Sequence, residues 1–158
     1  MKLLLENILY CLVFTITVRI FAGKDARGCL YFYPKEYQEI AYERGVADRE
    51  KVARSRKIFL IVFTSIMALL LVVLLKKNGV KGFKETYLQA LLFLEVMNLY
   101  DGIVIDRIWV GNDPFWKIKG MEDTPYVQTR KEAIRKRGFL ALFWIFAAAL
   151  IAAIVIHI

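Results

Sequence analysis

The chain has 158 residues, of which 58% are hydrophobic and 14% aromatic, and its 23 Lys and Arg outnumber 15 Asp and Glu for a net charge of +8. A chain this apolar is not disordered, because it can bury enough surface to offset the entropy of ordering. Its apolar residues form uninterrupted blocks instead of recurring at core spacing, which excludes an ordinary soluble fold. We therefore predict an all-α integral membrane protein, a single domain of four transmembrane helices over residues 1–158.

The first predicted span covers residues 3–22 and carries one charge near each of its ends. Glu6 and Arg19 lie where long side chains can reach the lipid headgroups. A cleaved signal peptide is the alternative, since Lys2 precedes the apolar stretch. We expect this helix to be retained, because Arg19 occupies a position where a cleavage region is normally uncharged.

The loop of residues 23–57 is rich in Lys and Arg and is predicted to contain one helix outside the membrane, from Pro34 to Lys57. Proline suits a first helical position, and Glu36 and Glu39 suit the positive end of the helix dipole. The helix is either a surface that binds acidic lipids or a partner, or a solvated extension of the second span. We favour the solvated extension.

Residues 58–75 and 138–158 form the two clearest spans. Neither segment contains Asp, Glu, Lys or Arg. At the rise of an α-helix, the longer segment is roughly 30 Å long, which matches the hydrocarbon core of a bilayer. A buried helix of a soluble protein is excluded, because it needs a larger protein around it than this chain supplies.

The third span, residues 86–105, is the most polar of the four. A helical projection places Glu95, Asn98, Asp101 and the neighbouring Asp106 on one face. Carboxylates inside a membrane are costly, so this face must meet the helix bundle, a water-filled cavity or a partner chain.

Three interpretations of this polar face remain open. Its oxygen atoms could line a pathway for a hard cation or a proton, with Glu95 nearest the middle of the membrane. The acids could instead be structural, with Arg19 and Asp101 forming an intramembrane ion pair because the two reach a similar depth. The third interpretation is a docking surface for another membrane protein.

The second long loop, residues 106–137, contains turn signals and several large aromatic residues. We predict an ordered loop whose rings lie at headgroup depth, and a lid over a site is the alternative. The predicted interfacial rings are Trp109, Phe115, Trp116 and Tyr126.

The distribution of Lys and Arg predicts the orientation in the membrane. The two long loops contain seventeen of these residues, against five in the N-terminus and the turn of residues 76–85. Cytoplasmic loops carry the excess of Lys and Arg, so both long loops are predicted to be cytoplasmic and both termini outside. We expect the plasma membrane, with anionic headgroups against the basic loops.

Several kinds of chemistry are excluded by the residues that the chain lacks. His157 is the one histidine, and Cys11 and Cys29 do not form a CxxC motif. Zinc sites built on histidines, paired-histidine haem ligation and thiol oxidoreductase chemistry are therefore excluded. The chain has no Walker A or dinucleotide-binding loop. We predict no metal, no cofactor and no nucleic-acid partner, and we assign the chain to no family.

The function we expect is non-enzymatic. The chain would act as a transport or channel component, or as an accessory subunit, through its third-span polar face. Four spans are too few to build a wide pathway, so we expect a homo-oligomer or a complex with another membrane protein. The alternative is an enzyme that handles lipid headgroups at the cytoplasmic interface. Its candidate residues are Asp101, Asp106, Arg107 and either Glu122 or Asp123.

Overall fold

The computed structural model describes residues 1–24, 26–124 and 129–158, and the regular structure in these ranges is helical. The long helices are α1 (Lys2–Ala22), α3 (Arg49–Lys77), α4 (Gly82–Tyr100) and α6 (Arg130–His157). Helix α4 continues without a break through the π-helix η2 (Asp101–Trp109) and the short α5 (Val110–Asn112). Three short elements complete the described chain: η1 (Arg27–Phe32), α2 (Lys35–Glu43) and η3 (Pro114–Trp116).

Four of these helices are long and apolar enough to cross a membrane, counting Gly82–Asn112 as one. The prediction of an all-helical chain with four such segments is therefore confirmed. The bounds differ from those predicted in three places: the first long loop, the end of the third span and the start of the fourth.

The single helix predicted over residues 34–57 is wrong, because the chain turns in the middle of this segment. Helix α2 ends at Glu43, and Gly45 then adopts a positive φ of 66°. Helix α3 begins at Arg49, where the Asp48 carboxylate accepts a hydrogen bond from the Lys51 backbone N–H at 2.8 Å. This cap satisfies a free amide at the helix start, so the basic end of the loop belongs to α3.

The third span also extends beyond its predicted end, since the helix continues from residue 105 to Asn112. Helix α6 likewise starts outside its apolar run, at a capping box formed by Thr129 and Glu132. Each of these two side chains accepts a hydrogen bond from the backbone N–H of the other residue. The two helices therefore extend polar turns toward the same end of the molecule.

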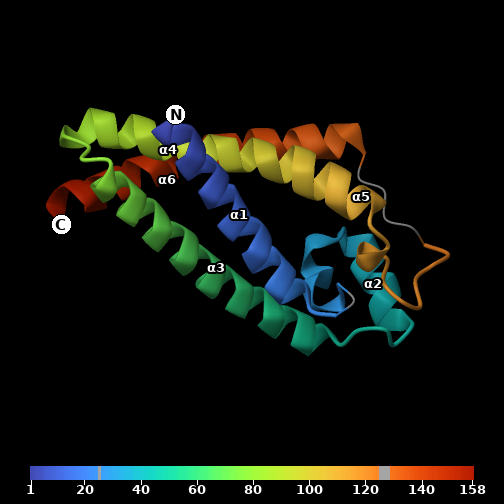
Figure 1. The fold of residues 1–158 in the computed structure, drawn as a ribbon. Helices are drawn as coiled ribbons and strands as arrows, with labels where there is room; N and C mark the ends of the chain where they lie inside the picture. Colours follow the sequence, from blue (N-terminus) through green and yellow to red (C-terminus); the bar gives the residue numbers. More distant parts are fainter. Residues whose placement is uncertain (25, 125–128) are drawn as a thin grey trace.

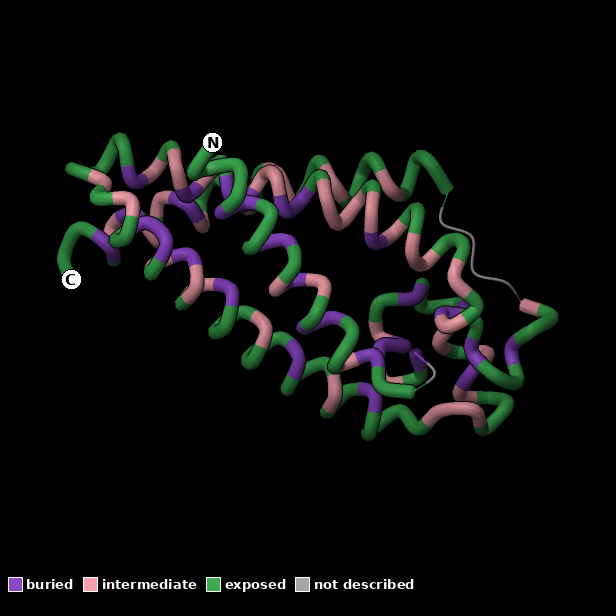
Figure 2. The backbone as a smooth tube through the Cα atoms, in the orientation of Figure 1, coloured by how far each residue is buried: buried purple, intermediate pink, exposed green. Residues whose placement is uncertain are grey.

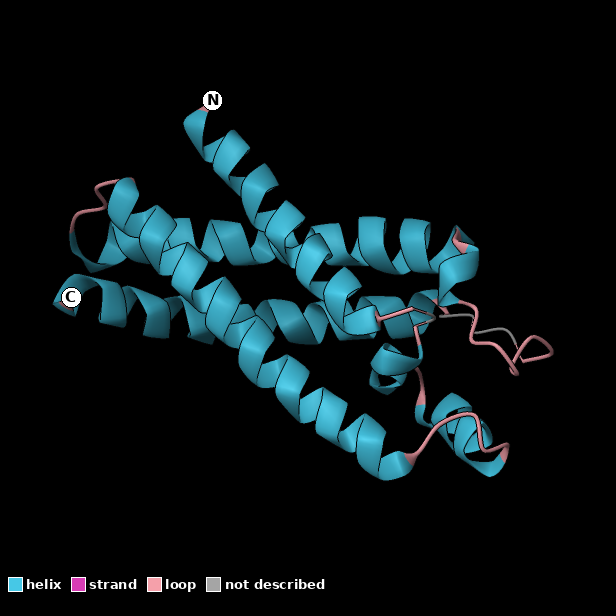
Figure 3. Ribbon diagram, turned by 60° about the horizontal axis from the view of Figure 1, so that its bottom comes forward, coloured by secondary structure: helices cyan, strands magenta, loops and turns pink. Residues whose placement is uncertain are grey.

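Helices α4 and α6 make the most extensive contact between elements and run side by side (Figure 1). Helix α1 crosses against α3 and α4, while α3 leans away from α4 and α6 toward the end where the loops gather (Figure 3). We call this the loop end. The buried faces point inward, and most outward faces are exposed (Figure 2). Exposed large apolar side chains such as Leu69 and Phe146 suit a lipid surface.

The loop end is a small packed unit in which the two long loops meet. The Tyr33 hydroxyl donates a hydrogen bond to the Trp116 carbonyl at 2.7 Å. On the exposed side of this unit, Arg44 forms an ion pair with Asp123 at 2.5 Å. Segments that are far apart in sequence are thus tied together next to the ends of α1 and α3.

At the opposite end, the Glu6 side chain points into the protein, and its expected depth near the headgroups stays a prediction. Its side chain is buried, and one of its oxygens accepts a hydrogen bond from the Asn78 amide at 2.8 Å. The Lys2 ammonium lies 4.0 Å from the other oxygen. The Asn78 amide also donates to Gln89 at 3.3 Å. These polar contacts connect the start of α1 to the turn between α3 and α4.

Candidate functional site

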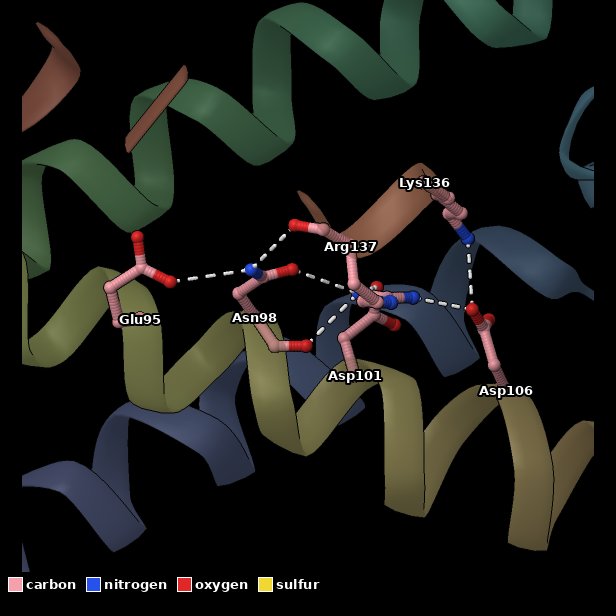
Figure 4. Close-up of polar contacts among 6 residues, drawn as sticks. All are labelled: Glu95, Asn98, Asp101, Asp106, Lys136 and Arg137. Atoms are coloured by element: carbon pink, nitrogen blue, oxygen red, sulfur yellow. Dashed lines mark hydrogen bonds and ion pairs between the residues drawn. The ribbon is translucent and has the colours of Figure 1, made fainter. Parts of the chain in front are cut away.

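A charged cluster joins η2 to the first turns of α6, with Arg137 at its centre (Figure 4). One guanidinium nitrogen of Arg137 donates to the Asn98 carbonyl at 3.0 Å and to an Asp101 carboxylate oxygen at 2.6 Å. The other terminal nitrogen donates to Asp106. The fork of the guanidinium thus holds both aspartates at once.

Two further contacts complete this cluster. The Lys136 ammonium lies 2.9 Å from the same Asp106 oxygen. The Asn98 amide donates to Glu95 and to the Arg137 carbonyl, each at 3.3 Å. Two aspartates therefore face two cations, and the central side chains of Arg137 and Asp101 are only 15% and 20% exposed. We call these six residues the Arg137 cluster.

The local backbone explains why both aspartates reach one guanidinium. In a π-helix, hydrogen bonds join residues five apart, so such residues lie nearly above one another. Asp101 and Asp106 are five residues apart, and both lie in η2. Gly102 makes room for Arg137, since a Cβ built there would lie 2.9 Å from the Arg137 Nε. The widened turn and the missing side chain together admit the arginine.

The predicted ion pair between Arg19 and Asp101 is not formed. Arg19 donates to the Gly23 carbonyl at 2.7 Å, and its guanidinium lies 4.1 Å from the centre of the Phe115 ring. Asp101 binds Arg137 instead. The sequence analysis counted Arg137 only among the Lys and Arg of the loop of residues 106–137. Its position directly before the uncharged run of the fourth span was the signal that it lies level with the end of the third.

A cavity of about 400 Å³ lies beside the Arg137 cluster, between α1, α3, η2 and α6. Asn98, Asp101, Asp106, Lys136 and Arg137 border it on one side. The rest of its wall is mainly aromatic and aliphatic. The aromatic side chains include Phe14, Phe32, Phe59, Phe63, Trp116 and Trp144.

Two of the aromatic residues that line this cavity have an unused hydrogen-bond donor. The indole N–H groups of Trp116 and Trp144 are buried and have no acceptor in the part of the chain that the structure describes. Buried polar groups are normally satisfied, so these two donors are exceptions, and neither nitrogen is accessible from the cavity.

The aromatic residues of the second loop form part of this wall. Trp116 is only 5% exposed and packs edge-to-face with Trp109 and Phe115, at ring distances of 5.1 and 5.3 Å. Trp116 therefore belongs to the protein core. The prediction of headgroup depth stays a prediction for Trp109, Phe115 and Trp116, and Tyr126 lies outside the described residues.

Of the residues of the enzyme alternative, Asp101 and Asp106 meet at Arg137, whereas Glu122 and Asp123 have other partners. Asp123 pairs with Arg44, and the Arg44 guanidinium lowers the pKa of this carboxyl group. The pKa of Glu122 is lowered by a hydrogen bond from the Gly120 backbone N–H. Arg107 is exposed on η2. Within the described ranges, no three His, Cys, Asp or Glu residues are grouped as metal ligands.

The chain matches no protein-family model, and no curated protein or solved structure matches it. Fold and site still define a class. The chain is an all-helical protein with four helices that could cross a membrane, and it has a cavity with aromatic walls and one charged side.

Proposed function

We propose that this protein binds a membrane lipid in the cavity beside the Arg137 cluster, without chemical conversion of the lipid. The observation that carries the proposal is the two-sided lining of the cavity. Its aromatic and aliphatic wall suits an acyl chain, and its charged side suits a headgroup.

The position of the cavity along α6 supports this proposal. Lys136 and Arg137 end the basic run of α6, and Leu140 and Trp144 belong to the uncharged run that follows. All four line the cavity. The boundary between the polar and apolar parts of the helix therefore crosses the cavity, as the junction of headgroup and chain does in a lipid.

Lipid binding is better supported than the cation pathway, one of the three interpretations left open for the third-span carboxylates. Asp101 and Asp106 are each bound by Arg137, and Lys136 adds a second cation at Asp106. A cation entering this face would have to displace those partners. Glu95, which lies nearest the middle of the membrane, is hydrogen-bonded by Asn98.

The proposal includes the topology expected from the basic loops. With the loop end in the cytoplasm and both termini outside, the charged side of the cavity lies in the cytoplasmic leaflet. A lipid-binding subunit of a transport complex in the plasma membrane, or a homo-oligomer, fits this arrangement.

Fluorescence of Trp116 tests the proposal. The chain has three tryptophans, so the double substitution Trp109→Phe and Trp144→Phe leaves Trp116 as the only indole. This variant is placed in bilayers containing phospholipids brominated near the head end of the acyl chain. We expect quenching, because a lipid chain in the cavity brings bromine against a ring that is otherwise buried.

A matched pair of substitutions on α3 controls for lipid around the protein. Thr64→Phe adds a ring to the cavity wall, whereas Leu69→Phe adds one to a side chain that is 66% exposed. We expect Thr64→Phe to abolish most of the quenching and Leu69→Phe to preserve it. Equal quenching in both variants, or none in the parent protein, would refute lipid binding in the cavity. Circular dichroism checks that each variant keeps its helices.

A further inference from the structure

We infer that the bound lipid carries an anionic phosphate headgroup, and that Arg135 binds this phosphate in a second hollow beside the cavity. The inference rests on the proposed lipid binding and names the chemical class of the ligand. The hollow has a volume of about 500 Å³. Phe32, Tyr33 and Lys136 line both spaces, so the hollow and the cavity adjoin.

Hydrogen bonding distinguishes the two spaces. In the cavity, the two cations of the Arg137 cluster are bound by two aspartates. Lys136 belongs to that cluster, so Arg135 is the cation that the hollow adds. The one acidic side chain of the hollow, Glu132, accepts hydrogen bonds from the backbone N–H and the hydroxyl of Thr129 at 3.0 and 2.7 Å, and Arg135 acts on it through its charge without a hydrogen bond.

Arg135 is therefore the cation available to a ligand. It makes no hydrogen bond or ion pair with any residue that the structure describes, and it is exposed at the hollow. A guanidinium offers paired donors that match two phosphate oxygens. Lys136 lies next to it along the chain and is already paired with Asp106.

A phospholipid matches both spaces at once. Its phosphate would meet Arg135 in the hollow, and its acyl chain would lie between the aromatic walls of the cavity.

The experiment compares two headgroups on the same brominated chains. The Trp116-only protein is reconstituted with brominated phosphatidylglycerol or brominated phosphatidylcholine, diluted into bilayers of constant surface charge. We expect phosphatidylglycerol to reach half-quenching at a mole fraction about fivefold lower, the effect of one basic side chain near an anionic headgroup. Arg135→Gln should abolish this preference, and Lys131→Gln, a matched loss of one exposed cation in α6, should preserve it.

Each other result overturns the inference in a distinguishable way. Quenching without a headgroup preference refutes the phosphate site and leaves lipid binding intact. A preference lost equally in both variants assigns it to general surface attraction. Absence of quenching by either lipid refutes the proposed function as well. Inorganic phosphate is added as a soluble competitor, and displacement of the lipid by it would assign the hollow to a free anion.

Discussion

Arg137 is the residue on which the charged cluster depends, because it binds two aspartates and a backbone carbonyl that nothing else connects. The three contacts come from positions 98, 101 and 106, spread over two turns of the third spanning helix. Removal of the guanidinium leaves one aspartate without a cation and the other with Lys136 alone. The free energy lost by leaving these buried carboxylates without their cation then exceeds the free energy of any single hydrogen bond.

We predict that Arg137→Gln lowers the free energy of unfolding by about 3 kcal/mol, the range for breaking a mostly buried pair. Arg137→Lys should lower the free energy of unfolding by less, because an ammonium keeps the positive charge although it lacks the paired N–H donors of a guanidinium. The measurement is a denaturant titration in detergent micelles. Adding Asp101→Asn and Asp106→Asn to Arg137→Gln should recover at least part of the loss. If the triple variant is even less stable than Arg137→Gln alone, unpaired charge is not the cause of the lost stability.

At the residue scale, the sequence predicts the polar face of the third span but not its partner. Glu95, Asn98, Asp101 and Asp106 are in one cluster with Arg137, as their shared face suggested they could be. Two arginines were available at a similar depth, and hydropathy cannot choose between them. Both α1, which carries Arg19, and α6 contact α4, and the choice falls to α6 because its contact with α4 is far more extensive.

The π-helix η2 is the element that shapes the site. A π-turn places more residues in each turn than an α-helix and is rarely stable without a local reason. Here the reason is the entry of Arg137 at Gly102, where the backbone has no side chain to exclude it. The element and the cluster therefore depend on each other.

We predict that Gly102→Ala destabilises the protein by about 1–3 kcal/mol, because the added methyl overlaps the Arg137 side chain. Gly138→Ala is the matched control on α6, where an added Cβ meets nothing within 4 Å. That change should be neutral or stabilise the helix by about 0.5–1 kcal/mol. Thermal unfolding of both variants in the same detergent checks the difference. Equal effects would show that Gly102 makes no special room.

At the element scale, long apolar runs were predictable and breaks between polar helices were not. The prediction of one helix over residues 34–57 followed its charges and overlooked Gly45, whose positive φ ends the helical path. Aspartate is a residue type that often caps a helix start. Whether a helix begins after Asp48, however, depends on the turn before it. Tertiary contacts of the loop end decide such breaks.

Across the whole molecule, the two long loops are joined at the loop end by Arg44 and Asp123 as well as by apolar packing. Arg44 lowers the pKa of Asp123 below its ordinary value. The ion pair therefore stabilises the contact between the two loops at pH values above the ordinary pKa of an aspartate, about 3.9. This contribution is lost as the pH falls through the lower pKa that Asp123 has in the folded protein. The pKa of Glu122 is lowered as well, because its carboxylate accepts a hydrogen bond from the Gly120 backbone N–H.

We predict that Arg44→Gln reduces protection from hydrogen exchange in residues 114–124 at neutral pH, and that the difference from the parent protein disappears in acid, once the pH has fallen below the lowered folded pKa of Asp123. Rates are corrected for the intrinsic dependence on pH. Arg49→Gln is the matched control, since it removes an exposed ion pair with Glu39 that does not touch this loop. A difference that persists in acid would show that Arg44 acts through packing.

The Arg137 cluster also has a consequence for biosynthesis. The helix that carries the two aspartates is made before the helix that carries their cation, because residues 101 and 106 precede residue 137. Until α6 emerges from the ribosome, the polar face of the third segment lacks its arginine and is costly to release into lipid. Integration of the third segment thus depends on the arrival of the fourth. The two should leave the translocon as a pair.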